Sequence, residues 1–538
     1  MEMDVNIAAM MSLDLDADIS ASVPVSVLLA TSIVLLYLLY TNLFGQESWE
    51  KYGVKHISLG RLALQDSRVL VSTLIAQHGD TVGFNTGTMM LLTRDLDLIR
   101  QIAAKDSNNF LDRLTLCVTR SAMESGLFFL GGKSWRRVRN VMTPSFSTGK
   151  LKQACTNIEE SAQKLATVLE EFARNQTLLP VKHITSQYTS EIIARSAFGL
   201  RTDCLGKGDD EFTYCAKNIF NINGKIATMI VHAVSRSKTL HHVLAKTLGV
   251  SLFDMVNKET DRYFHTLVSS LVSQRVELER QVTNKPTDLL QSLVAAKLAG
   301  DTEAEDGGSH DQTWGKLPKT MSDRELLGQC ILVVFAGFET TATTLQMCLY
   351  LLAKHPDIQE KVHQEICSVV ASDSPTYEEL GQLTYLEQVI KETLRLYPPI
   401  PLYRRVAAET KTYGHVTIPK NTVVIVPLEE IMKDPRNYPD PHKFDPDRFS
   451  PENSKQRDPI TFVPFGYGPR LCIGMRLAYL ELKIGLVHVL RKVRVELSEL
   501  TEPQIGGGVS LKFQGFIVVE KPIQLEVKLR QNNTSKTD

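Results

Sequence analysis

The sequence predicts a mainly helical protein with a small β portion, preceded by a transmembrane helix. Helical apolar patterns dominate the chain, over residues 153–173, 321–353, 356–371, 385–397 and 475–491. The β-like runs are short and widely spaced, at Thr88–Thr93, Val423–Val426 and Gln514–Val519, which excludes a regular alternation of strands and helices. An uncharged segment near the N-terminus is long enough to cross a membrane.

The uncharged segment, residues 23–40, reads VPVSVLLATSIVLLYLLY. A hydrocarbon core about 30 Å thick needs roughly 20 residues of helix. The residues before it include several acids and no Lys or Arg, which is unlike a cleaved signal peptide, and basic residues follow at 51, 55 and 61. The positive-inside rule therefore predicts an acidic lumenal tail (1–22), an anchor (23–44) and a cytosolic remainder.

The composition excludes several classes of protein. The 538 residues include 60 Lys and Arg against 61 Asp and Glu, so the chain is neither a basic nucleic-acid-binding protein nor an acidic solvating one. A hydrophobic content of 43% is enough for a large buried core. The eight cysteines are scattered, with no Cys-x-x-Cys, as in reduced proteins that face the cytosol.

Two further features organise the long apolar pattern at 321–353. Residues 300–320 are polar and contain several glycines, which predicts an exposed loop. Ser322 and Glu325 then form a Ser-x-x-Glu capping box, which predicts the start of a helix. The glycines near 131 and 466 lack the spacing of a phosphate loop or of a dinucleotide fingerprint, so any electrons for redox chemistry must come from another protein.

A lone cysteine lies in the glycine-containing window Phe465–Gly474, FGYGPRLCIG. Glycines on both sides of Cys472 allow backbone N–H groups to turn toward its sulfur, and such contacts stabilise a thiolate and tune a bound metal. The helical pattern that follows places the sulfur near a helix N-terminus, which favours negative charge. Arg470 could meet an anionic group of the same cofactor. The alternative is an inert cysteine buried in a turn.

This window is similar to the haem-binding signature F-x-x-G-x-R-x-C-x-G of the cytochrome P450 family, through Phe465, Gly468, Arg470, Cys472 and Gly474. The resemblance extends over about residues 63–530. The sequences of the motifs are most similar to those of the microsomal clan of drug- and steroid-oxidising enzymes, which includes thromboxane synthase. It implies the cytochrome P450 fold as one large domain (63–538) behind a linker (45–62). Unlike its relatives, this linker has no proline-rich hinge.

The resemblance also implies a set of cofactor-binding residues. Haem b would lie between the 321–353 helix and Cys472, whose thiolate would be the axial ligand of the iron. Trp135 and Arg139 match the family's W-x-x-x-R element, which binds a haem propionate. Guanidinium groups suit carboxylates, and the further candidates for the propionates are Arg113, Arg405 and Arg470.

Ala336–Thr341, AGFETT, resembles the family's oxygen-activating signature A/G-G-x-D/E-T. The resemblance implies that Thr340 hydrogen-bonds dioxygen and that Glu339 helps to deliver protons. The alternative is that Glu339 reaches solvent or an arginine and that Thr340 only bonds the carbonyl four residues before it.

Glu392 and Arg395 are spaced to pair on one face of a helix and resemble the family's E-x-x-R motif. With Arg448 they are expected to form a buried triad that serves folding and haem retention rather than chemistry.

The function implied is that of a monooxygenase of the endoplasmic reticulum membrane, which inserts one atom of O2 into a lipophilic small molecule. Electrons would come from NADPH through NADPH-cytochrome P450 reductase, with cytochrome b5 as an optional partner, and no nucleic acid is expected to bind. The alternatives are an isomerase of a lipid peroxide in the same family, or a non-catalytic haem or lipid binder. The expected pocket is mostly apolar: Phe128, Phe335, Ala336, Phe338, Ile400 and Phe516.

Overall fold

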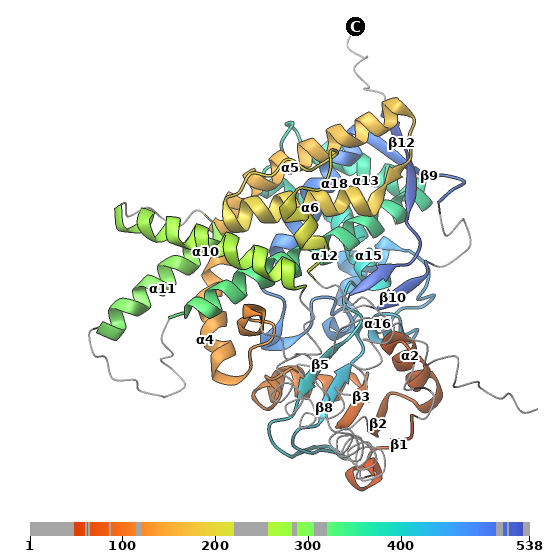
Figure 1. Ribbon diagram of the computed structural model, residues 1–538. Helices are drawn as coiled ribbons and strands as arrows, with labels where there is room; N and C mark the ends of the chain where they lie inside the picture. Colours follow the sequence, from red (N-terminus) through yellow and green to blue (C-terminus); the bar gives the residue numbers. More distant parts are fainter. Residues whose placement is uncertain are drawn as a thin grey trace, which may run out of the picture. The chain divides into compact units, whose positions relative to one another are not determined.

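Long helices packed side by side form most of the structure, and a five-stranded sheet lies beside them (Figure 1). The computed structural model describes residues 48–59, 62, 65–85, 88–113, 121–219, 257–281, 288–305, 320–501, 509–513 and 516–530. The described residues belong to one unit of the chain, Ser48–Asp538. The predicted lumenal tail and anchor lie outside them.

The described α-helices are α2 (Ser67–His78), α3 (Leu96–Arg100), α4 (Gly132–Met142), α5 (Thr148–Asn175), α6 (Val181–Phe198), α7 (Glu211–Lys217), α10 (Lys258–Gln281), α11 (Leu289–Glu305), α12 (Asp323–Lys354), α13 (Pro356–Val369), α14 (Tyr377–Gln382), α15 (Thr384–Leu396), α16 (Leu428–Met432), α17 (Pro451–Lys455) and α18 (Met475–Lys492). Shorter helical turns are η2 (Trp49–Tyr52), η4 (Gln101–Lys105), η5 (Ser107–Phe110), η6 (Ala122–Ser125), η7 (Thr143–Phe146), η8 (Pro446–Phe449), η9 (Pro459–Thr461) and η10 (Gly468–Arg470).

The described strands are β1 (His56–Ile57), β2 (Thr81–Asn85), β3 (Met89–Thr93), β4 (Leu179–Pro180), β5 (Tyr403–Val406), β6 (Lys411–Tyr413), β7 (Val416–Ile418), β8 (Val423–Val426), β9 (Val493–Leu497), β10 (Leu511–Phe513), β11 (Ile517–Val519) and β12 (Gln524–Leu529). The largest sheet has the order β1-β2-β3-β8-β5. Its central pair, β3 and β8, is parallel and joins Leu91 to Val424.

Helix α12 runs through the core and packs against α6, α15 and α18. Its capping box has formed, because Ser322 Oγ accepts from the Glu325 amide at 3.2 Å and Glu325 accepts from the Ser322 amide at 3.0 Å. Within the described ranges, it is the single helix long and apolar enough to cross a membrane. Two thirds of its apolar window (67%) is buried inside the protein, so α12 is a core helix.

The predicted elements agree with the observed ones in most places. The five predicted helical segments correspond to α5, α12, α13, α15 and α18, and two of the predicted strands to β3 and β8. The third contains β11, while residues 514–515 are not described. One boundary was wrong, because α11 continues to Glu305 in the segment predicted as a loop. The loop residues 306–319 lie outside the described ranges.

Residues 48–59, which fall within the predicted linker of 45–62, lie in the same unit as the rest of the described residues. The Trp49 side chain is fully buried, packs where a Cβ on Gly83 would be, and donates from Nε1 to the Phe84 carbonyl at 3.3 Å. Strand β1 pairs in parallel with β2. Residues 49–57 are therefore held against the sheet.

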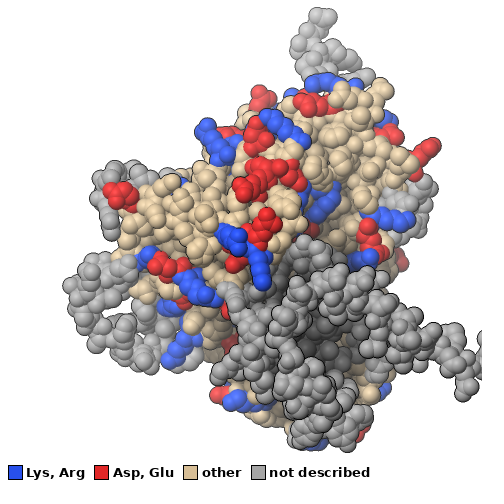
Figure 2. Space-filling view, viewed as in Figure 1, with Lys and Arg blue, Asp and Glu red and all other residues tan. Residues whose placement is uncertain are grey.

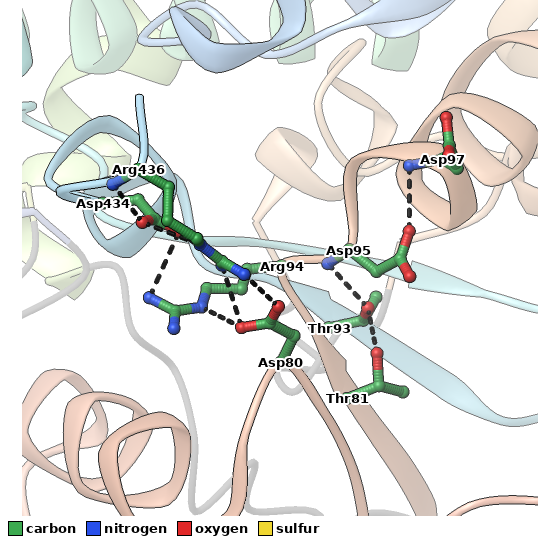
Figure 3. Close-up of polar contacts among 8 residues, drawn as sticks. All are labelled: Asp80, Thr81, Thr93, Arg94, Asp95, Asp97, Asp434 and Arg436. Atoms are coloured by element: carbon green, nitrogen blue, oxygen red, sulfur yellow. Dashed lines mark hydrogen bonds and ion pairs between the residues drawn. The ribbon is translucent and has the colours of Figure 1, made fainter. Parts of the chain in front are cut away.

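A group of ion pairs ties the β2–β3 hairpin to the segment after α16 (Figure 3). Arg436 contacts both Asp80, at 2.7 Å, and Asp434, while Arg94 contacts Asp80 at 2.6 Å. Nearby, the hydroxyl groups of Thr81 and Thr93 bond across the hairpin at 2.8 Å. These guanidinium groups lower the pKa of Asp80 and, against the effect of burial, that of Asp434, so both carboxylates stay charged and the cluster joins segments far apart in sequence.

Glu392, Arg395 and Arg448 lie together. Glu392 and Arg395 are fully buried and form a two-point ion pair with distances of 2.7 and 2.8 Å, and Arg448 Nε lies 3.5 Å from Glu392 Oε1. Arg395 also donates to the carbonyl of Met432 at 3.0 Å and that of Pro441 at 2.7 Å. Burial raises the pKa of Glu392, and the two arginines oppose that rise.

The triad predicts a large loss of stability on removal of its one negative charge. Glu392→Gln leaves two buried guanidinium groups without a counter-ion, so the free energy of unfolding should fall by about 3–5 kcal/mol. Urea unfolding followed by circular dichroism measures this loss. The control is Lys207→Ala, which breaks the exposed pair with Asp203 and should leave the urea midpoint unchanged. Equal midpoints for the two variants would contradict a structural role of the triad.

Candidate active site

The Phe465–Gly474 window folds into a closed turn that presents Cys472. The Cys472 amide donates to the Phe465 carbonyl at 3.0 Å, and the Leu471 amide donates to the Gly468 carbonyl at 2.9 Å. Gly468 has a φ of 75°, and a Cβ there would come within 1.8 Å of the Ala103 carbonyl oxygen. Glycine is therefore required at this position, for its conformation and for the close approach of the backbone of η4.

The Cys472 sulfur lies at the start of α18. The backbone N–H groups of Gly474 and Met475 donate to it, and Arg139 and Arg113 are close enough to favour its negative charge. Burial has the larger effect and raises the pKa of the Cys472 thiol. The side chain nevertheless has exposed surface although protein surrounds the residue, so that surface faces a space inside the protein. A metal in this space would remove the thiol proton, and the two amides would then stabilise the thiolate.

Four arginines lie close to one another around Cys472: Arg113, Arg139, Arg405 and Arg470. Burial and the charges of Arg405 and Arg470 lower the pKa of Arg113, and burial together with Arg405 and Arg139 lowers that of Arg470. Among the described residues, no carboxylate lies within ion-pairing distance of Arg139, Arg405 or Arg470. Buried cations at such close quarters favour an anionic partner. A carboxylate-bearing cofactor is the kind of group that this cluster fits.

Arg470 also has a structural contact that the sequence did not predict. Its guanidinium donates to the carbonyl of Leu111 at 2.9 Å, to that of Leu127 at 3.2 Å and to that of Leu130. It lies 4.5 Å from the centre of the Trp135 ring, which is itself buried on α4. Arg470 therefore holds Leu111, the 127–130 backbone and α4 against the cysteine turn, in addition to contributing charge.

Arg405 lies on β5 and is 2% exposed. Its guanidinium is 4.4 Å from the centre of the Tyr403 ring, and its Nη1 donates to the Arg404 carbonyl at 3.0 Å. Tyr403 is a neighbour of the site that sequence reasoning missed. The run Tyr403-Arg404-Arg405 is a usable signal, because two adjacent arginines in a short strand place a charge on the buried face.

Thr340 bonds the carbonyl four residues before it, as the alternative to an oxygen-activating role predicts. Its Oγ1 donates to the Ala336 carbonyl at 2.7 Å. Ala336 is exposed although Val334 and Phe338 on either side are buried, so this side of α12 has open space beside it. Thr340, one turn further on, is half-buried on the same side of the helix. The hydroxyl oxygen keeps its acceptor capacity toward that space.

Glu339 points toward α6. Its Oε1 lies 2.6 Å from Lys182 Nζ and accepts from the Thr343 hydroxyl at 3.3 Å, while Lys182 also donates to Thr343 at 3.0 Å. The partner of Glu339 is thus a lysine, where the alternative expected solvent or an arginine. Lys182 was missed because it lies on another helix and its surrounding sequence carries no motif.

Phe338 differs from the other residues predicted to line the pocket. Phe335 and Phe516 contact each other with ring centres 4.8 Å apart, and Phe128, with 41% of its surface exposed, lies under the Arg113 guanidinium at 4.0 Å. Ile400 is half-buried. Phe338 is a correction: it is 3% exposed and packs in the core with residues of α6 and α10, on the side of α12 away from Ala336.

These observations fit haem as the cofactor. A cysteine thiol at a helix N-terminus can ligate iron, clustered arginines can hold two propionates, and apolar and aromatic side chains can cover the macrocycle. Glu339 and Thr340 lie on different sides of α12, so the structure does not bring the two predicted oxygen-activating residues into mutual contact.

Comparisons with known proteins agree with this site. The family model of Cytochrome P450 matches residues 63–527. Cytochrome P450 3A12 of Canis lupus familiaris is 30% identical over 517 residues, covering 94% of this chain and 97% of its own. Cytochrome P450 6k1 of Blattella germanica is 32% identical over 493 residues (87% and 91%), and Lithocholate 6-beta-hydroxylase of Mesocricetus auratus is 29% identical over 517 residues (94% and 97%). The chain thus belongs to the cytochrome P450 family, as a haem-dependent monooxygenase that uses O2.

Proposed function

We propose that this monooxygenase oxidises lipophilic small molecules of the xenobiotic, steroid or fatty-acid kind at the endoplasmic reticulum membrane. Residues 23–44 anchor it there, residues 1–22 are lumenal, and the catalytic domain faces the cytosol. The observation that carries its chemistry is the Cys472 sulfur, which receives the amides of Gly474 and Met475 at the start of α18. Haem, when bound, supplies the activation of O2 and the transfer of one oxygen atom to substrate.

The residues around the site support an apolar substrate. Phe335 and Phe516 contribute aromatic surface, and Ala336 leaves open space beside α12. Binding against such a surface is stabilised by the burial of apolar area, and these residues offer no polar side chain to orient a polar ligand. One relative is named for hydroxylating lithocholate. We assign Thr340 to hydrogen bonding with dioxygen, and Arg113, Arg139 and Arg405 with Trp135 to the propionates.

The electrons come from NADPH through NADPH-cytochrome P450 reductase, with cytochrome b5 as an optional second donor. A groove of about 470 Å³ lies beside the cysteine turn and is lined by Phe465, Leu471, Arg476 and Lys483. Of the basic residues considered for contact with the reductase, Lys133 and Lys455 are exposed, whereas Arg137 pairs with Glu325. Acidic and basic side chains are mixed over α5 and α6 on the face shown in Figure 2, so the described residues there form no extended basic field.

The first prediction concerns the axial ligand. Reduced, carbon-monoxide-treated membranes that contain this chain should show the strongly red-shifted Soret band of thiolate-ligated haem. Cys472→Ser should abolish that band, while Cys367→Ser, an exposed thiol on α13, should retain it. A wild-type band at the position of neutral-ligand haem would rule out Cys472 thiolate as the ligand.

The second prediction separates the monooxygenase from the isomerase alternative. Product formation should require both NADPH and reductase, and Thr340→Ala should lower the product formed per NADPH, on the order of 10-fold or more, because a positioned hydroxyl is lost. Thr340→Ser should retain most of the coupling. Conversion of a lipid peroxide without reductase, unaffected by Thr340→Ala, would favour the isomerase.

A further inference from the structure

Arg404 carries a guanidinium group without a partner inside the protein. It lies on β5, at the edge of the five-stranded sheet (Figure 1). Its Nε is buried without a hydrogen-bond acceptor, and no carboxylate of the described residues lies within ion-pairing distance of its side chain. The side chain still has exposed surface although protein surrounds the residue, so that surface faces a space inside the protein. An anion that entered this space would relieve the cost of an unpaired buried cation.

Arg404 is separate from the arginines around Cys472. On β8, Ile425 pairs with Arg404 and Val424 pairs with Arg405. Ile425 packs in the hydrophobic cluster that includes α2, whereas Val424 packs in another cluster on the opposite face of the sheet. Directly paired residues point to the same face and successive residues to opposite faces, so Arg404 faces α2 and Arg405 faces away from it. Neither of the two charges affects the pKa of the other, which agrees with this separation. Arg404 is therefore not one of the groups available to the haem propionates.

The surroundings of Arg404 are apolar. Leu402 and Val406, the residues two places before and after it, belong to a buried cluster that also contains Leu74 of α2. Helix α2 carries an arginine of its own, Arg68, but that side chain is held by Glu429 in a two-point ion pair with distances of 2.5 and 2.7 Å. A ligand bound at Arg404 would therefore meet one unpaired positive charge with apolar side chains beside it.

The predicted substrate pocket adjoins this part of β5. Ile400 lies four residues before Arg404, which is a span of about 13 Å in extended chain. The carbonyl of Pro399 accepts from the Ile517 amide at 2.9 Å. The β10–β11 hairpin, which includes the pocket residue Phe516, is therefore bonded to the segment that leads into β5.

The same hairpin is also bonded to α2. Asp66, the N-cap of α2, accepts from the Phe513 amide at 3.2 Å and from the Arg68 amide at 2.8 Å. The hairpin thus joins the pocket at Phe516 to the helix that covers the face on which Arg404 lies. A molecule that extends from Phe516 toward α2 would bring one end close to the Arg404 guanidinium.

We propose that Arg404 binds the carboxylate of the substrate, and that the enzyme acts on lipophilic monocarboxylic acids. A guanidinium group is planar and presents paired N–H donors that match the two oxygens of a carboxylate. The apolar part of such an acid would lie against Phe335 and Phe516, while its charged end would neutralise Arg404. A neutral molecule of the same shape would leave the guanidinium unpaired. The inference rests on the monooxygenase function proposed above and narrows its substrates to acids.

Equilibrium dialysis of the full chain in lipid nanodiscs tests this recognition without requiring turnover. The probes are two pairs of molecules that share an apolar part and differ in charge: dodecanoate with dodecanol, and retinoate with retinol. Wild type should bind at least one acid about 10-fold or more tightly than its alcohol, as expected of hydrogen bonds to a charged group. The absence of any preference for the acid in both pairs would overturn the proposal.

Variants of Arg404 then locate the preference. Arg404→Gln keeps much of the volume and removes the charge, so it should bind the preferred acid about 10-fold or more weakly and its alcohol as tightly as wild type does. Arg404→Lys should retain part of the preference, since it keeps the charge and loses the paired geometry. The matched control is Arg174→Gln, which removes an exposed arginine of α5 and should bind as wild type does. Unchanged acid binding in Arg404→Gln would overturn the proposal.

Turnover separates this inference from the proposed function. With reductase and NADPH, wild type should oxidise the preferred acid, and Arg404→Gln should raise KM for it about 10-fold while kcat changes little, because the lost contact is one of binding. Oxidation of the alcohols in preference to the acids, with the red-shifted carbon monoxide band intact, would overturn acid recognition and leave the monooxygenase. Loss of that band from wild type would instead remove the haem-thiolate function, while the dialysis would still decide whether Arg404 binds acids.

Discussion

As the ligand of haem iron, Cys472 would need a negatively charged sulfur atom in the interior of the protein. Desolvation opposes that charge, and four groups favour it: the amides of Gly474 and Met475, and the guanidinium groups of Arg113 and Arg139. The amides require the turn before α18, which in turn requires glycine at 468 because the backbone of η4 passes so close. The arginines come from segments hundreds of residues earlier, so the site exists only when the N-terminal and C-terminal parts of the domain are packed together.

Helix α12 serves two environments at once. One side, at Ala336 and Thr340, has open space beside it, and the other, at Glu339 and Thr343, contacts Lys182 on α6. A helix turns about 100° per residue, so consecutive residues of one motif necessarily point in different directions. Glu339 and Thr340 are therefore adjacent in sequence but their side chains do not contact each other, and each has a different partner.

The sequence was sufficient for the helices with strong apolar periodicity and for the cysteine turn, whose residues are local. It was also sufficient for the Glu392–Arg395 pair, because a spacing of three places both side chains on one helix face. It failed where the determining contact is remote. The burial of Trp49 depends on Gly83, and the partner of Glu339 is Lys182 on another helix. Because α12 is apolar on all sides, its sequence does not show which side faces the open space at Ala336.

The parallel pairing of β3 with β8 has a consequence for synthesis of the chain. The β2–β3 hairpin can form early, but Leu92 finds its partner Ile425 only after most of the domain has left the ribosome. At ~5–20 residues per second that interval is on the order of 20–60 s, during which the apolar edge of β3 lacks its neighbour. An unpaired edge is a template for association with other chains, so the nascent protein depends on protection of this hairpin until its C-terminal half arrives.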